Sequence, residues 1–198
     1  MKTVFIALLG LVALVHTARG QATPLGSGLY RSAEAFRNHR LTLAVDCKTE
    51  THKLRLHEFS GKPYVTVVHG GKPYQVAKDS LFGYRDCDGI DYRFAADHRH
   101  YPILNPGEEL LLYKMEQFEG GKNAGRTPAQ LFFSPTANAP MQPLTLLAVK
   151  KAFPDNHRFH DLLDAQFQNG ELTAYDQMHG MTKINWLLRQ SRVETATH

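Results

Sequence analysis

The stretch LFGYRDCDGIDYRF, residues 81–94, decides the predicted fold because it places a tight turn between two short alternating segments. Asp88-Gly89 is a strong hairpin signal, since both residue types accept the backbone angles that a two-residue turn requires. Large apolar side chains share one face of each arm: Phe82 and Tyr84 before the turn, and Ile90, Tyr92 and Phe94 after it. The stretch therefore predicts two antiparallel strands.

The sequence before this hairpin has the same two-residue period. Residues 41–47 and 53–59 alternate between apolar and polar side chains, as a half-buried strand does. GKPY at residues 61–64 recurs at 71–74 and frames the β-branched run VTVV, which predicts a hairpin that turns at Gly70-Gly71. Ser32 is placed to cap a short helix that ends near Arg37.

The sequence after the hairpin changes from strands to helices. Residues 101–104, 110–115 and 131–134 are strand-like, and a polar, glycine-rich loop precedes the last of them. A first helix is predicted over 144–153, where Pro154 stops it, and a second follows from a cap at Asp155 or Asn156 to Asn169-Gly170. The apolar spacing of residues 172–188 predicts one or two final helices, with a break at Gly180.

Strands followed by helices are typical of the α+β class. We expect an antiparallel β-meander or open barrel of about seven to nine short strands, followed by two to four C-terminal helices. The expected organisation is a signal peptide over 1–20, a flexible leader over 21–29, one domain over 30–190 and a disordered tail over 191–198. Within the domain, residues 41–134 are expected to be β-rich and residues 144–190 helical.

The first twenty residues have the pattern of a secretory signal peptide. Lys2 precedes an uncharged apolar run over 3–15, and Ala18 and Gly20 match the small residues at a cleavage site before Gln21. An uncleaved membrane anchor is the alternative, but the run is short for a span, and no later stretch reaches the ~18 apolar residues that one needs. We therefore expect a periplasmic or secreted domain without a membrane span.

Charge and cysteine content narrow the function further. Without Lys2 and Arg19 the chain keeps 21 basic against 19 acidic residues, which lacks the basic excess of a nucleic-acid-binding domain. Cys47 and Cys87 are the only cysteines. In an oxidising compartment they either pair as a disulfide or remain two buried thiols, and the sequence leaves both open.

Two groups of histidines are candidate metal ligands. His157, His160, Asp161 and Asp164 have helical spacing that puts them on one face of the second helix, where imidazole and carboxylate groups could bind a divalent ion. A solvated polar face produces the same pattern. His98 and His100 would point the same way on a strand, but no third ligand follows by spacing, and a polar connection between two strands is therefore the favoured explanation. No cofactor is predicted.

Three motifs resemble an uncharacterised group of small exported proteins of Bacteroidetes-type bacteria: DSLFGYR at 79–85, YRF at 92–94 and KKAFPDN at 150–156. The motifs contain turn and core residues. The resemblance implies an exported location, and it implies no activity, because none is known for that group.

Two functions of different class remain. The first is a non-enzymatic extracytoplasmic domain that binds a protein or carbohydrate ligand through its sheet face or through the loop near residues 119–128. It is favoured because no cluster of residues forms a specific catalytic signature. The second is a metal-dependent hydrolase that uses the histidine and aspartate groups above.

Overall fold

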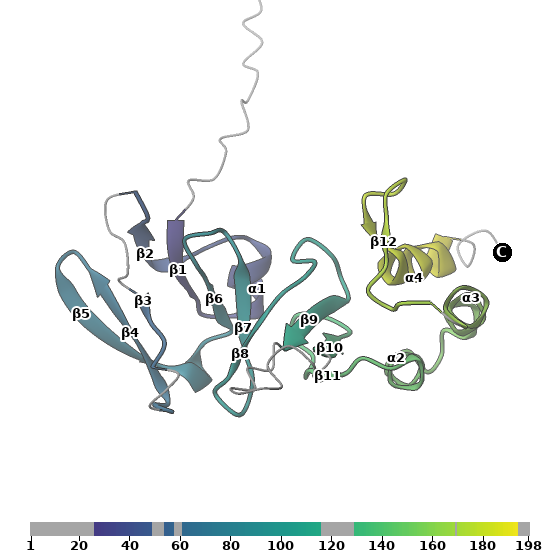
Figure 1. The fold of residues 1–198 in the computed structure, drawn as a ribbon, viewed down its shortest axis with the longest axis horizontal. Helices are drawn as coiled ribbons and strands as arrows, with labels where there is room; N and C mark the ends of the chain where they lie inside the picture. Colours follow the sequence, from purple (N-terminus) through teal and green to yellow (C-terminus); the bar gives the residue numbers. More distant parts are fainter. Residues whose placement is uncertain (1–25, 49–53, 58–60, 116–128, 169, 194–198) are drawn as a thin grey trace, which may run out of the picture.

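The computed structural model describes residues 26–48, 54–57, 61–115, 129–168 and 170–193. Over these ranges, short antiparallel strands come first and helices cluster at the C-terminal end, so the predicted α+β class is confirmed (Figure 1). The strands are β1 (Gly26–Tyr30), β2 (Thr42–Asp46), β3 (Leu54–Arg55), β4 (Tyr64–His69), β5 (Lys72–Ala77), β6 (Gly83–Arg85), β7 (Asp91–Phe94), β8 (His100–Pro102), β9 (Leu111–Met115), β10 (Gln130–Ser134), β11 (Gln142–Pro143), β12 (Tyr175–Asp176) and β13 (Met181–Thr182). The helices are α1 (Ala33–Arg37), the 3-10 turn η2 (Lys78–Ser80), α2 (Leu146–Ala152), α3 (His157–Phe167) and α4 (Lys183–Val193).

The central sheet has the strand order β2-β1-β6-β7-β8. β1 lies inside this sheet and pairs with both β2 and β6, so the predicted flexible leader is wrong for residues 26–29. The sequence does not signal this strand, because its glycines and serine lack an apolar alternation and the sheet supplies the hydrogen bonds that order it. The predicted tail is also wrong at its start, since α4 continues to Val193.

The hairpin that decided the prediction is present as β6–β7. Asp86 forms the turn, because its carboxylate accepts hydrogen bonds from the backbone N–H groups of Asp88 and Ile90 at 3.0 and 2.8 Å. Gly83 allows the two strands to approach closely, since a Cβ atom there would lie 1.8 Å from the Tyr92 carbonyl oxygen. Any side chain at position 83 would therefore push the strands apart.

Two further sheets flank the central one. The outer sheet (β3-β4-β5) contains the predicted β4–β5 hairpin, whose turn uses Gly70 and Gly71 at φ +57° and +76°. The helix-side sheet (β11-β10-β9) lies between the central sheet and the helices. All of these sheets remain open at their edges rather than closing into a barrel.

The layers follow the chain from one end of the molecule to the other: outer sheet, central sheet, helix-side sheet and helices (Figure 1). An apolar cluster fills each space between neighbouring layers. β9 shows how a strand serves two clusters, because Leu112 faces the helices while Leu111 and Tyr113 face the central sheet. Burying both faces explains why β9 has a continuous apolar sequence.

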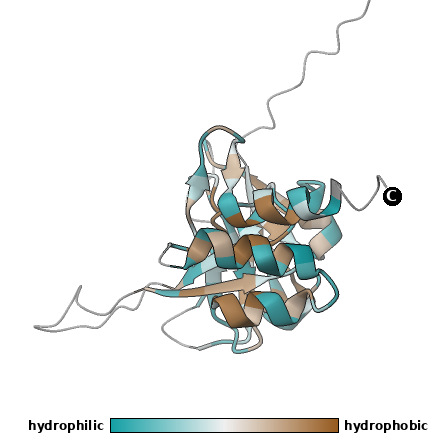
Figure 2. Cartoon of the chain, turned by 90° about the vertical axis from the view of Figure 1, so that its right-hand side faces the viewer, coloured by the Kyte–Doolittle hydropathy of each residue, from teal (hydrophilic) through white to brown (hydrophobic). Residues whose placement is uncertain are grey.

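The last three helices form one outer layer in which α3 lies between α2 and α4 (Figure 2). Thr145 caps α2 and Asn156 caps α3, each by accepting a backbone N–H of the first turn. Phe159, Leu163 and Ile184 are fully buried against the helix-side sheet, and each contributes roughly 1.5–3 kcal/mol through removal from water. The apolar spacing that predicted the second helix therefore marks its packing face.

The prediction of helix throughout residues 172–188 is wrong for residues 172–182. Here β12 and β13 form a two-stranded hairpin, and only Lys183–Val193 is helical. The apolar spacing predicted a helix here, but Asp176 favours a turn. Its carboxylate accepts hydrogen bonds from the backbone N–H groups of Met178 and His179.

Cys47 and Cys87 form a disulfide with a Cα–Cα distance of 5.5 Å. The bond joins the segment after β2 to the turn between β6 and β7, and therefore ties an edge of the central sheet to its middle. A link across 40 residues contributes about 4 kcal/mol in the chain-entropy model. Within the described ranges, no helix is both long and apolar enough to cross a bilayer.

Candidate ligand-binding site

The predicted polar face of α3 packs partly against α2. His160 Nε2 lies 3.1 Å from the Lys150 carbonyl oxygen and 2.9 Å from that of Phe153, so this ring bonds to the end of α2. Lys150 also forms an ion pair with Asp164. His157 lies on the exposed side, with its ring centroid 5.9 Å from that of His160. Asp161 is exposed as well, so the four candidate ligands do not converge on a cavity.

His98 and His100 have different neighbours. His98 occupies the turn between β7 and β8 at φ +63°, and its Nδ1 atom is 3.2 Å from an Asp79 carboxylate oxygen. His100 begins β8, and its ring packs edge-on against Tyr84 and Tyr92 at 5.6 and 5.4 Å between centroids. Among the residues that the structure describes, no three His, Cys, Asp or Glu side chains are grouped to hold a metal ion.

A buried ion pair lies where the central sheet faces the helix-side sheet. Asp91, only 2 % exposed, accepts two hydrogen bonds from Arg85 at 2.8 Å and one from the Tyr30 hydroxyl at 2.8 Å. Burial, followed by the hydrogen bond to Asp91, raises the pKa of Tyr30 above its ordinary value. The carboxylate is thus fully engaged by Arg85 and Tyr30, and this group is structural.

Arg93 lies two residues after Asp91 and therefore on the same face of β7. Its guanidinium donates to the Tyr113 hydroxyl at 2.9 Å, the Ser134 hydroxyl at 3.1 Å and the Ala139 carbonyl at 2.8 Å. All three acceptors are neutral. In the described part of the chain, Arg93 forms no ion pair, because Asp91 is already bound by Arg85. Arg93 thus hydrogen bonds to three segments, and no carboxylate of the described residues pairs with its positive charge.

Aromatic rings surround the same guanidinium. The Arg93 Cζ atom is 5.2 Å from the centroid of the Phe82 ring and 5.8 Å from that of Tyr113. Such contacts stabilise a cation by about 0.5–2 kcal/mol, depending on its exposure to water. They hold the half-buried guanidinium in place, but they do not neutralise it.

Two hollows share Arg93 in their walls. The polar hollow, about 360 Å³, is lined with Arg93 by Arg31, Ser32, Asp79, Ser80 and Asn138. The apolar hollow, about 420 Å³, is lined with Arg93 by Ala95, Ala96, Tyr101, Phe132 and Met141. A pocket that is mostly apolar with one fixed polar group is the usual form of a small-molecule site. The arrangement defines a candidate ligand-binding site at Arg93.

One acid lines each hollow. Asp79 lines the polar hollow and lies 3.2 Å from His98 Nδ1, and Asp97 lines the apolar hollow and accepts the Arg99 guanidinium at 2.6 Å. Neither forms an ion pair with Arg93, although both add negative potential nearby. The Arg93 guanidinium, together with exposed Arg31 in the polar hollow, is therefore the group through which the site can recognise an anionic ligand.

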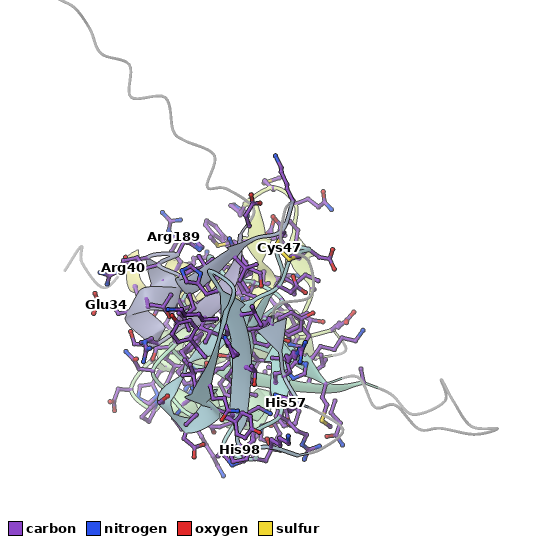
Figure 3. All side chains as sticks on the ribbon, turned by 90° about the vertical axis from the view of Figure 1, so that its left-hand side faces the viewer. Glu34, Arg40, Cys47, His57, His98 and Arg189 are labelled. Carbon is purple, nitrogen blue, oxygen red and sulfur yellow. A yellow bond between two sulfur atoms is a disulfide. The ribbon has the colours of Figure 1, made fainter. Side chains whose placement is uncertain are left out.

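A third hollow of about 430 Å³ lies between the turn before β9 and α4. Its Arg192 makes a two-point ion pair with Glu109, at 2.6 and 2.8 Å, and its Glu108 carboxylate accepts the backbone and hydroxyl groups of Thr182. Arg189 lines this hollow, and Figure 3 shows Arg189 at the opposite edge of the molecule from His98. Because its acids serve these internal bonds, this hollow is the weaker candidate.

The sequence did not identify Arg93 as a functional residue. Asp91 and Arg93 alternate with Tyr92 and Phe94, and this alternation is what a strand with one solvated face shows. The face is instead covered by the helix-side sheet. The only signal in the sequence is a pair of opposite charges on a strand flanked by aromatic residues. Its meaning depends on the helix-side sheet of β9, β10 and β11, which lies far along the chain.

The fold and site define an α+β domain with an arginine at the junction of two hollows. Comparisons with protein-family models, with curated proteins and with solved structures each found no match. The function must therefore be inferred from the site itself.

Proposed function

We propose that this chain is a non-enzymatic domain, periplasmic or secreted, that binds a small molecule at the two hollows that share Arg93. One observation carries the proposal: a half-buried guanidinium, held by neutral acceptors and aromatic rings, faces an apolar hollow of about 420 Å³. Holding a cation away from water costs free energy unless a partner offsets the cost. A ligand in the hollow offers that partner.

The location outside the cytoplasm rests on two further features. The disulfide between Cys47 and Cys87 suits an oxidising compartment. The uncharged apolar run at residues 3–15, which lies outside the described residues, has the composition of a signal peptide. The loop near residues 119–128, predicted above as an alternative binding region, also lies outside the described residues, so the proposal uses the sheet face alone.

The test is binding of anilinonaphthalene sulfonate, a fluorescent anion with an apolar body, to the disulfide-bonded protein. Ala96 is exposed and lines the apolar hollow, so Ala96→Trp fills this hollow without entering the core. Ala165→Trp is the matched control, because Ala165 is also exposed but lies on α3.

We expect saturable binding by the native protein and by Ala165→Trp. Ala96→Trp should bind at least about tenfold more weakly, a difference of about 1.4 kcal/mol. Equal binding by the two tryptophan variants would show that the probe binds elsewhere and would overturn the proposed site. Absence of binding to the native protein would overturn the proposal as well.

A further inference from the structure

We infer that the ligand is an amphiphilic organic acid, whose oxyanion head binds Arg93 and whose apolar body fills the hollow beside Phe132 and Met141. This inference rests on the proposed function, since it names the chemical class that the same site selects. It has three supports: the donors that Arg93 leaves unused, the charge of the polar hollow, and the lining of the apolar hollow.

Arg93 has hydrogen-bonding capacity to spare. A guanidinium has five N–H donors, and three of them are taken by Tyr113, Ser134 and Ala139. Among the described residues, the remaining donors have no hydrogen-bond acceptor. Guanidinium donors point in a fixed, planar arrangement that matches the oxygens of a carboxylate or phosphate. The internal bonds therefore fix the orientation of Arg93 while leaving part of its edge available.

The polar hollow favours an anion. Arg31 and Arg93 both line it, and Arg31 is exposed. Asp79, the acid in its wall, is next to His98 at 3.2 Å. Ser32 is committed as the cap of α1, where its hydroxyl accepts the Ala35 N–H. The two arginines thus leave this hollow with a positive balance.

The apolar hollow specifies the rest of the ligand. Tyr101 is 5 % exposed and packs edge-on against Phe132 at 5.4 Å between centroids, so this wall is rigid. Met141 also lines this hollow, is half-buried and adapts its shape readily. Aromatic and thioether groups favour a flat or aliphatic hydrocarbon. A hydrophilic anion such as inorganic phosphate would leave this surface uncovered.

The experiment compares three ligands that share one apolar body. Phenylpropionate, phenylpropanol and phenylpropylamine are titrated calorimetrically into the disulfide-bonded protein. Acetate and inorganic phosphate, which are anions without the apolar phenylpropyl group, are titrated as controls. We expect phenylpropionate to bind about tenfold or more tightly than the alcohol, because a hydrogen bond to a charged group is stronger than one to a neutral group. The amine should bind most weakly, and acetate and phosphate more weakly than phenylpropionate.

Variants separate recognition of the head from a merely structural role. Arg93→Met should bring the affinities for the acid and the alcohol to within about twofold, because it removes the charge and keeps an unbranched side chain. An arginine that only supports the fold would weaken both ligands equally and leave the tenfold ratio, and this result would overturn the inference. If Arg93→Met does not fold, Arg31→Met provides the test in its place. Because Arg31 is exposed, Arg31→Met should lower the ratio of acid affinity to alcohol affinity without changing the stability of the fold.

The outcomes also distinguish this inference from the proposed function. Equal binding of acid, alcohol and amine, with loss of all three in Ala96→Trp, would retain the binding site and reject the anionic class. Inorganic phosphate as tight as phenylpropionate would reject the amphiphilic body. No binding of the three phenyl compounds or of anilinonaphthalene sulfonate would reject both proposals.

Discussion

Asn105 and Asn185 donate from their side-chain amides to one acceptor, the Leu110 carbonyl oxygen, each at 2.8 Å. Asn185 also accepts the Leu110 N–H at 2.9 Å, and Asn105 accepts the Leu112 N–H at 2.7 Å. The two amides therefore take the place of a neighbouring strand at the start of β9. Since Asn185 belongs to α4, the same bonds fasten the last helix to the helix-side sheet.

Asn185→Ala is expected to lower the free energy of unfolding by about 2 kcal/mol, because the buried Leu110 N–H loses its acceptor. Urea denaturation measures this loss. Gln166→Ala is the matched control, since Gln166 is an exposed amide on α3. Equal effects of the two substitutions would contradict the role of Asn185.

Replacement of both cysteines by serine, Cys47→Ser with Cys87→Ser, is expected to lower the free energy of unfolding by about 4 kcal/mol. The physical reason is the loss of a constraint on a 40-residue segment of the unfolded chain. Denaturation with and without a reductant measures it. Reductant should destabilise the native protein but leave the double variant unchanged, and sensitivity of the double variant would point to another cause.

Alkaline pH is expected to destabilise the protein through Tyr30. Burial and the bond to Asp91 raise the pKa of Tyr30 in the folded state above its ordinary value of 10.0. The stabilisation of the folded state by protonated Tyr30 is therefore complete below pH 10.0. It declines as the pH rises further, because the tyrosine loses its proton in the unfolded state before it does so in the folded state.

The check is the unfolding free energy measured between about pH 9 and 11. Tyr30→Phe should show a shallower decline than the native protein over this range. Tyr175→Phe, which removes a hydroxyl from a tyrosine that is 58 % exposed, should follow the native curve. A Tyr30→Phe curve parallel to the native one would rule out this source of pH dependence.

The β12–β13 hairpin is expected to loosen in acid. The His179 side chain, followed by backbone N–H bonds, lowers the pKa of the Asp176 carboxyl below its ordinary value of 3.8. Because the pKa is lowered in the folded state, the ionised Asp176 carboxylate stabilises the hairpin fully above pH 3.8. This stabilisation is lost as the pH falls through the folded-state pKa. His179 stacks on Trp186 at 3.5 Å between ring centroids, so the tryptophan reports the change.

Trp186 is the only tryptophan, so its fluorescence can be followed directly during an acid titration. The native protein should show a fluorescence change below pH 3.8. Asp176→Asn should lack that change, because an amide does not titrate in this range. A transition of the same midpoint in both proteins would assign it to another group.

Local sequence signals predicted the elements that local chemistry controls. The β6–β7 hairpin, the Gly70-Gly71 hairpin and the Ser32 cap are present because each uses contacts between residues that are few positions apart. The connection from β6 to β7 spans residues 86–90 rather than Asp88-Gly89 alone, because the Asp86 carboxylate closes a wider turn. The helix packing face of α3 was predicted for a related reason, since its apolar spacing is set by the helix itself.

The misjudged elements depend on distant residues. β1 is ordered by pairing with β6, more than fifty residues later in the chain, and its own glycines gave no strand signal. His160 was grouped with a solvated polar face, but its ring is half-buried because the end of α2 supplies two carbonyl acceptors. The turn between β12 and β13 forms because the Asp176 side chain accepts a backbone hydrogen bond. The surrounding apolar pattern indicates a helix and does not reveal this bond.

By itself, the sequence determined the α+β order, the main hairpins and the helix caps, because turn geometry and hydrophobic period act over a few residues. Only the tertiary structure decided that Cys47 meets Cys87, and that Arg93 has neutral acceptors while Arg85 takes Asp91. The physical reason is that charge pairing and cavity shape depend on which layers face each other, and contacts such as Cys47–Cys87 and Arg93–Ser134 join residues 40 and 41 positions apart.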